Sequence, residues 1–194
     1  AAQEDAPFLC YVPFNAPHGP FQVPKRYEEP YAHINGKRRR TYYGMISALD
    51  EEVGRILDAL DEAGVAHNTL VWFFSDNGGV RQIRENNAPL RGAKLTTYEG
   101  GVRTVACLRF PARIPGGRRI TEPVAAVDVL PTVLALAGIS PQEAGCKPLD
   151  GVDLMPLLAG ERSDLPERDL YFYHGQGGED NEPIAVISGR RKLV

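Results

Sequence analysis

The sequence predicts an α/β fold in which a mixed central sheet is flanked by helices. Short continuous apolar runs at residues 8–12, 70–74 and 105–110 predict strands that are covered on both faces. Between the first two runs, apolar residues recur with helical period over residues 45–60, and Gly64 is placed as a C-terminal cap. This helix is expected to pack one face on the sheet.

The second half of the chain predicts two more helices. The first covers residues 127–137, with Asp128 as its N-cap and Gly138 at its end. Asp128 is interpreted as a cap and not as a catalytic acid, because Pro131 stands in the first turn and a leucine-rich face follows. A shorter apolar helix is predicted over residues 154–158.

From residue 168 onward the pattern changes to short apolar runs around a polar turn at residues 179–182. Such runs are typical of antiparallel hairpins. We therefore expect the main domain to cover residues 1–160, and residues 161–194 to begin a small C-terminal subdomain.

Composition describes an ordinary soluble protein. The 194 residues are enough for one sizeable core, 43% of them are hydrophobic, and the net charge is −3. The only basic run, at residues 37–40, is better explained as a solvated approach to a helix than as a polyanion site, so no nucleic-acid binding is predicted. No stretch is long enough to cross a bilayer. Three cysteines define no disulfide framework.

Polar side chains follow the apolar run at residues 70–74. Asp76 and Asn77 come at the end of this predicted strand, and their oxygens are hard donors of the kind that calcium or magnesium accepts. Gly78 and Gly79 then let the backbone turn without blocking a ligand. An Asx turn that leaves a strand would explain the same residues.

A histidine follows the first apolar run. His18 lies between Pro17 and Pro20, and prolines restrict both their own backbone and that of the preceding residue. The imidazole is therefore expected on a stiff loop, which suits a group that must be aimed. A surface histidine in a proline-rich turn is the alternative.

A glycine-rich loop at residues 90–103 precedes the third apolar run. Arg91, Lys94 and Arg103 would place cationic donors near the predicted metal site. Cationic side chains beside a divalent ion clamp tetrahedral oxyanions. These residues alone do not choose between phosphate and sulfate.

Taken together, these motifs resemble the sulfatases of the alkaline phosphatase superfamily. They occur in the order and at the spacing found in arylsulfatases, and they are most similar to arylsulfatase B, the N-acetylgalactosamine 4-sulfatase type. The matching segments are Pro-His-x-Pro at 17–20, Ser-Asp-Asn-Gly-Gly at 75–79, Leu-Arg-Gly-x-Lys at 90–94, Tyr-Glu-Gly-Gly-Val-Arg at 98–103 and Lys-Pro-Leu-Asp-Gly-Val-Asp-Leu at 147–154.

The resemblance implies an alkaline phosphatase-like fold and the hydrolysis of a sulfate ester, either an aryl sulfate or a sulfated sugar. It implies that Asp76 and Asn77 bind Ca²⁺, with Mg²⁺ possible. It implies that Lys94 contacts the sulfate, and that His18 contacts the sulfate or its bridging oxygen. A hydrated formylglycine is the nucleophile of the family. Periplasmic, secreted or lysosomal proteins are usual in it, and the oligomeric state is left open.

The nucleophile signature Cys/Ser-x-Pro-x-Arg is absent from this sequence. Cys10 and Cys107 have no proline at the required place, and Cys146 is followed by Pro148 but not by the arginine. The chain is therefore expected to be the C-terminal part of a sulfatase, inactive by itself. Two alternatives stay open: a phosphate or phosphonate hydrolase of the same superfamily, and a non-catalytic module that binds sulfated ligands.

Overall fold

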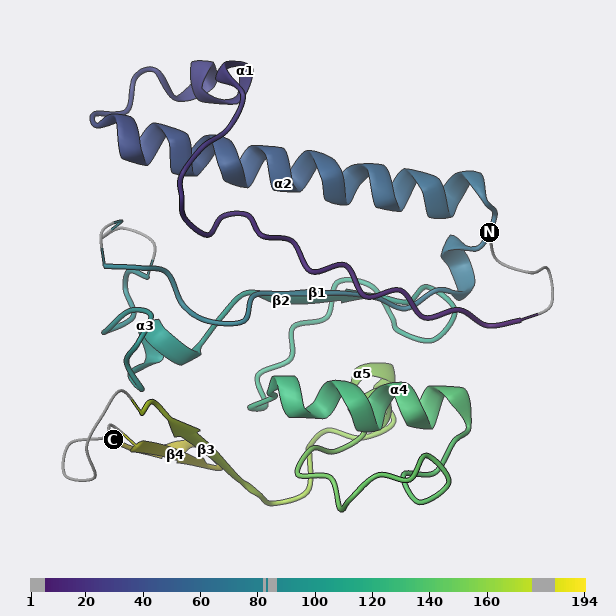
Figure 1. Cartoon of the computed structure of the whole chain (residues 1–194). Coiled ribbons are helices and arrows are strands. Elements are labelled where there is room, and N and C mark those ends of the chain that lie inside the picture. Colours follow the sequence, from purple (N-terminus) through teal and green to yellow (C-terminus); the bar gives the residue numbers. More distant parts are fainter. Residues whose placement is uncertain (1–5, 82, 84–86, 176–183) are drawn as a thin grey trace. The chain divides into compact units, whose positions relative to one another are not determined.

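The structure is a computed structural model that describes residues 6–81, 83, 87–175 and 184–194. The chain divides into two compact units, residues 1–65 and 66–194, which are described separately (Figure 1). The domain boundary expected near residue 160 stays a prediction. In the described part of the chain, no helix combines the length and the apolar character that crossing a membrane requires.

The first unit is built around one long helix. It contains α1 (Lys25–Glu28), the 3-10 turn η1 (Glu29–Tyr31) and α2 (Lys37–Glu62). The start of α2 is tied to α1 because the Thr41 hydroxyl donates to the Glu28 carboxylate at 2.7 Å. The chain leaves α2 through Gly64, whose φ is 69°, and the Val65 amide donates to the Leu60 carbonyl at 3.1 Å. The predicted helix and its glycine cap are thus confirmed.

The strand expected at residues 8–12 is wrong. This segment forms no strand in the described chain, and Leu9 and Tyr11 are 80% and 84% exposed. An apolar run becomes a strand only where a neighbouring strand takes its backbone hydrogen bonds. Within the described residues no such neighbour pairs with it.

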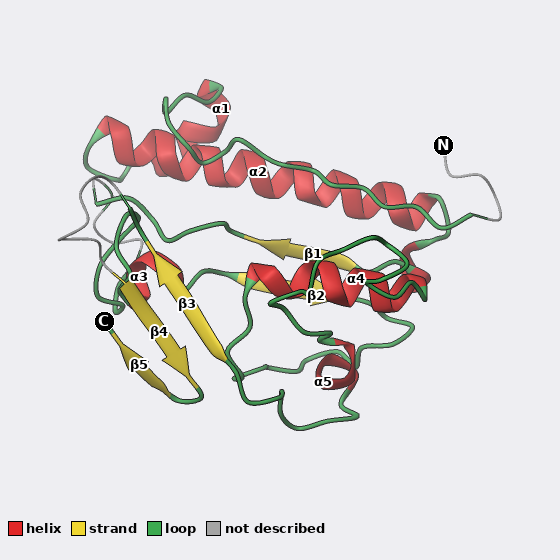
Figure 2. Ribbon diagram, turned by 60° about the horizontal axis from the view of Figure 1, so that its bottom comes forward, coloured by secondary structure: helices red, strands yellow, loops and turns green. Residues whose placement is uncertain are grey.

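The second unit opens with η2 (Ala66–Asn68) and then forms a two-stranded antiparallel sheet of β1 (Val71–Phe74) and β2 (Ala106–Arg109). Val71 pairs with Arg109 and Phe74 with Ala106. Both strands lie where the apolar runs predict them. The α/β class is confirmed, and the described part of the central sheet consists of this antiparallel pair (Figure 2).

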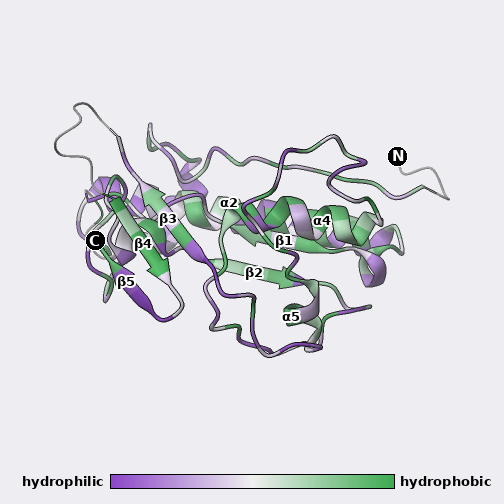
Figure 3. Ribbon diagram, turned by 90° about the horizontal axis from the view of Figure 1, so that it is seen from below, coloured by the Kyte–Doolittle hydropathy of each residue, from purple (hydrophilic) through white to green (hydrophobic). Residues whose placement is uncertain are grey.

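One short helix lies between the two strands in the sequence, and three more follow β2. They are α3 (Glu99–Val102), η3 (Ala126–Asp128), α4 (Val129–Ala137) and α5 (Met155–Ala159). As predicted, α4 ends at Gly138 and α5 ends at Gly160, both with left-handed backbone. Figure 3 colours most of α4, β1 and β2 as hydrophobic. The buried core joins these elements through Phe110, Leu154, Met155 and Leu158, with Trp72 and Leu108 packed against them.

The last segment forms the predicted antiparallel hairpin with one further strand. β3 (Asp169–Tyr173) pairs with β4 (Ile184–Ser188), and β4 pairs with β5 (Arg191–Leu193). The polar turn expected at residues 179–182 lies outside the described residues. The sheet order is β3-β4-β5.

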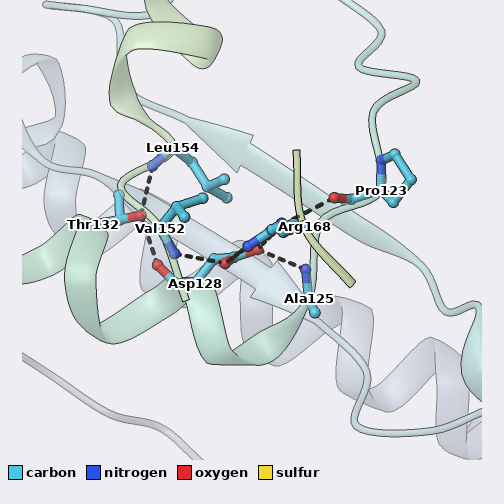
Figure 4. Close-up of polar contacts among 7 residues, drawn as sticks. All are labelled: Pro123, Ala125, Asp128, Thr132, Val152, Leu154 and Arg168. Carbon is cyan, nitrogen blue, oxygen red and sulfur yellow. Dashed lines mark hydrogen bonds and ion pairs between the residues drawn. The ribbon is translucent and has the colours of Figure 1, made fainter. Parts of the chain in front are cut away.

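The buried carboxylate of Asp128 connects segments of this unit that are distant in the sequence (Figure 4). Asp128 is fully buried and forms a two-pronged ion pair with Arg168, in which Nη2 lies 2.7 Å from Oδ2. The same carboxylate accepts the amides of Ala125 at 2.8 Å and Val152 at 3.0 Å. Asp128 does occupy the N-cap position of α4, but its side chain makes no cap bond there. The capping interpretation is therefore corrected: the side chain binds the start of η3 and joins distant segments.

The Asp128 backbone takes part in the same network. The Thr132 hydroxyl donates to the Asp128 carbonyl at 2.6 Å and accepts the Leu154 amide at 3.0 Å. Thr132 is also fully buried. Buried polar groups are costly unless they are hydrogen-bonded, so each member depends on the others.

Replacing Asp128 by alanine is expected to destabilise the protein by about 3–5 kcal/mol, because Arg168 would keep a largely buried charge without its partner. Chemical denaturation measures the change in unfolding free energy. Asp150→Ala, at an exposed aspartate, is the matched control and is expected to change stability by less than about 0.5 kcal/mol. Equal effects of the two substitutions would contradict this role of Asp128.

The pH dependence follows from the same contacts. Burial raises the pKa of Asp128, but the hydrogen bonds from Arg168 and from the amides of Ala125 and Val152 outweigh it, so the pKa is lowered from 3.8. The stabilisation is therefore complete above about pH 4 and is lost as the pH falls below it. Acid unfolding curves of Asp128→Asn should be flatter below pH 4 than those of the unsubstituted protein.

Candidate functional site

The turn after β1 presents two oxygen-bearing side chains. Asp76 is exposed, and its carboxylate has no hydrogen bond or ion pair within the described residues. The Asn77 amide nitrogen donates to the Gly78 carbonyl at 3.1 Å, which leaves the side-chain oxygen available. The Ser75 hydroxyl closes the turn by donating to the Asn77 carbonyl at 3.1 Å. Local hydrogen bonds thus shape the turn, while within the described residues the side-chain oxygens of Asp76 and Asn77 have no partner.

Lys94 lies on a second turn that is bonded to the first. Its backbone amide donates to the Gly79 carbonyl at 2.9 Å. The turn runs from Ala93 to Thr96 and is closed by the Thr96 amide, which donates to the Ala93 carbonyl at 3.1 Å. The half-buried Lys94 side chain has no partner for its ammonium group within the described residues. The structure therefore places the backbone of Lys94 beside the Asp76 turn.

The two loops approach each other so closely that only glycine fits between them. The Gly78 amide donates to the Gly101 carbonyl at 2.8 Å, and a Cβ built on Gly78 would lie 1.9 Å from the Gly100 carbonyl oxygen. A Cβ on Gly101 would lie 2.1 Å from the Thr96 carbonyl oxygen. A side chain at Gly78 would therefore push the two loops apart, and one at Gly101 would distort the Lys94 loop itself.

Asn87 links the same two loops through its side chain. Its amide oxygen accepts the Gly79 amide at 2.9 Å, and its amide nitrogen donates to the Gly79 carbonyl at 2.9 Å and to the Gly92 carbonyl at 3.4 Å. The sequence patterns described above do not identify this role of Asn87. No signal in a single sequence identifies it, because the contact depends on how two loops fold together.

The other two predicted cations have partners of their own. The Arg91 guanidinium lies 4.0 Å from the centroid of the Tyr98 ring and donates to the Tyr98 hydroxyl at 3.1 Å. Arg103 forms an ion pair with Glu99 at 3.5 Å. The expectation of three cationic donors near the site stays a prediction, and within the described residues Lys94 is the unpaired one of the three.

The small C-terminal sheet is connected to this loop by an ion pair. Lys192 of β5 lies 3.4 Å from the Glu99 carboxylate, and its ammonium is 5.8 Å from the centroid of the Phe172 ring. Glu99 is the first residue of α3 and follows the Lys94 turn in the sequence. This ion pair therefore links the sheet of β3, β4 and β5 to the Lys94 loop.

His18 belongs to the first unit. Its backbone amide donates to the Asn15 carbonyl at 2.9 Å, and its ring nitrogen Nδ1 lies 2.8 Å from the Gly19 carbonyl. A carbonyl can only accept, so Nδ1 carries the proton and Nε2 is left for another partner. The side chain is exposed. The stiff loop expected around His18 therefore leaves one nitrogen available.

The donors at Asp76 and Asn77 suit a hard cation but are only part of a complete set. Calcium takes six to eight oxygen ligands. In the part of the chain that the structure describes, no group of three or more His, Cys, Asp or Glu residues could hold a metal ion. A cation bound here and the ammonium of Lys94 could together stabilise an oxyanion between the two turns.

Comparisons with known proteins identify the family of this chain. The family profile described as Sulfatase matches residues 1–139. A sulfatase of Formosa agariphila is 32% identical over 97% of this chain and 37% of its own length. The N-acetylgalactosamine-6-sulfatase of Canis lupus familiaris is 32% identical over 87% of this chain and 31% of its own length.

Solved structures give the same result. The structure described as "Ps i-CgsB in complex with k-i-k-neocarrahexaose" superposes with a TM-score of 0.80 and 33% identity, covering 91% of this chain and 38% of that one. The chain thus spans about a third of the length of these relatives. The family profile matches most of the residues of this chain, and the motifs of the two turns are held together by backbone contacts. The chain belongs to the sulfatase family of the alkaline phosphatase superfamily.

Proposed function

We propose that the full-length protein containing this chain hydrolyses sulfate esters, and that this chain supplies part of the metal and sulfate site. One observation carries the proposal. The Lys94 amide is bonded to the Gly79 carbonyl at 2.9 Å, which holds the Lys94 backbone beside the Asp76 turn, and within the described residues neither the Lys94 ammonium nor the Asp76 carboxylate has a partner. Such a pair of groups suits a cation and an anion bound side by side.

Each residue has a role that its surroundings allow. Asp76 and the side-chain oxygen of Asn77 would hold calcium, which polarises sulfate oxygens when it is bound. Lys94 would bind a sulfate oxygen and stabilise the charge that develops as the ester bond breaks. His18, as an imidazolium that carries a second proton on Nε2, would donate that proton to the bridging oxygen as the alcohol leaves.

The nucleophile must come from outside these residues. The three cysteines of the chain are free thiols, and none stands in a Cys-x-Pro-x-Arg sequence. The formylglycine expected for the family is therefore assigned to the part of the full-length protein that this chain does not contain. By itself the chain is expected to bind ions without turnover.

A sulfated carbohydrate is the substrate class that the comparisons favour. A relative 33% identical to this chain was solved with a neocarrahexaose, and another at 32% is named an N-acetylgalactosamine-6-sulfatase. An aryl sulfate is the practical assay substrate, since arylsulfatase-type activity is what the motifs predict. The resemblance to N-acetylgalactosamine 4-sulfatases stays a prediction.

Replacing Lys94 by alanine in the full-length protein is expected to lower kcat/KM for 4-nitrophenyl sulfate by roughly 100- to 1000-fold, because one charge-stabilising donor is lost. Lys147→Ala, at an exposed lysine in the connector, is the matched control and should leave the rate unchanged. A phosphate ester that is hydrolysed faster than the sulfate would favour the phosphohydrolase alternative. Sulfate binding without any turnover would favour the non-catalytic module.

Replacing Asn87 by alanine is expected to weaken calcium binding roughly 10- to 100-fold, because Asn87 holds Gly79 directly after the proposed ligands. Calorimetric titration of the metal-free full-length protein with calcium measures this. Asn68→Ala, at an exposed asparagine in η2, is the control. If Asn87→Ala lowers the melting temperature while calcium affinity stays the same, Asn87 serves stability alone.

A further inference from the structure

Leu95 has a backbone conformation that its side chain does not favour. Its φ is 71°, and it is the one non-glycine residue with a positive φ in the described part of the chain. It occupies the third position of the turn from Ala93 to Thr96, where a positive φ normally selects glycine or asparagine. A branched apolar residue is strained there.

Burial does not explain why a leucine stands at this position. The side chain is 54% exposed, whereas its neighbours Ala93 and Thr97 are 4% and 2% exposed. An exposed side chain contributes little to the hydrophobic core. Glycine would fit the turn better and lose little packing, so stability alone does not account for the leucine.

The position of Leu95 in the site gives it a different use. It directly follows Lys94, on the turn that the Lys94 amide fastens to Gly79. Thr96 makes the turn rigid, because its hydroxyl donates to the Ala93 carbonyl at 2.8 Å and accepts the Ala93 amide at 3.2 Å. Two consecutive residues of the turn therefore carry different groups: Lys94 carries an ammonium, and Leu95 carries an exposed apolar side chain. Strained residues that the surrounding structure holds in place are common at ligand sites.

We infer that Leu95 is a specificity-determining residue that contacts the apolar face of the alcohol part of the sulfate ester, while Lys94 binds the sulfate. This inference rests on the proposed function. A sulfate ester has a charged end and an organic end, and the C–H face of a sugar ring or the face of an aromatic ring would pack against a leucine side chain. A small alcohol without such a face would gain nothing from it.

Two variants separate the apolar contact from the backbone strain. Leu95→Gly and Leu95→Asn both suit a positive φ, and both remove the apolar side chain. In the full-length protein, each is expected to lower kcat/KM for 4-nitrophenyl sulfate roughly five- to tenfold, mainly through a higher KM. The melting temperature should not fall, because the strain is relieved. Leu95→Met, which keeps an apolar side chain, should retain most of the activity.

Inhibition by inorganic sulfate is the second measurement, since this ion has no organic part. Its inhibition constant should be the same in Leu95→Gly and in the unsubstituted protein. Sulfate inhibition that weakens as much as substrate binding would overturn the inference, because Leu95 would then only orient Lys94. An unchanged kcat/KM in both variants would overturn it too. Turnover by the unsubstituted protein tests the proposed function separately.

Discussion

The candidate site depends on the antiparallel register of β1 and β2. Because Phe74 pairs with Ala106, the residues that leave β1 must lie beside the residues that enter β2. The pairing continues beyond the strands, since the Ser75 amide donates to the Val105 carbonyl at 3.1 Å and the Gly78 amide to the Gly101 carbonyl at 2.8 Å. The Asp76 turn and the Lys94 loop are therefore brought together by strand pairing, and glycines let their backbones touch.

A second constraint fixes the part of the chain with the least regular structure. Residues 138–154 connect α4 to α5 without a helix or strand, yet Val152 and Leu154 are bonded to Asp128 and Thr132. Gly151 approaches the Val127 carbonyl so closely that a Cβ there would lie 2.0 Å from its oxygen. These contacts give the Asp-Gly-Val-Asp-Leu segment a structural role, although it lies outside the two turns of the candidate site.

The sequence predicts well those features that depend on local pattern. The periodicity before Gly64, the runs that form β1 and β2, and the glycines that end α4 and α5 are encoded within a few residues. The strand expected at residues 8–12 fails because a strand also needs a partner. Asn87 is missed for a related reason: its hydrogen bonds join Gly79 to Gly92 across a loop, and nothing in the neighbouring residues encodes them.

The pairing of charges separates structural groups from groups suited to binding. Asp128 binds Arg168, and Glu99 binds Arg103 and Lys192, so these charges stabilise the fold. Asp76 and Lys94 carry opposite charges on loops whose backbones are hydrogen-bonded, yet within the described residues they form no ion pair. An exposed ion pair contributes only about 0–1 kcal/mol, so keeping the two groups apart costs little stability. It leaves the carboxylate available for a cation and the ammonium available for an anion, as the proposed function would need.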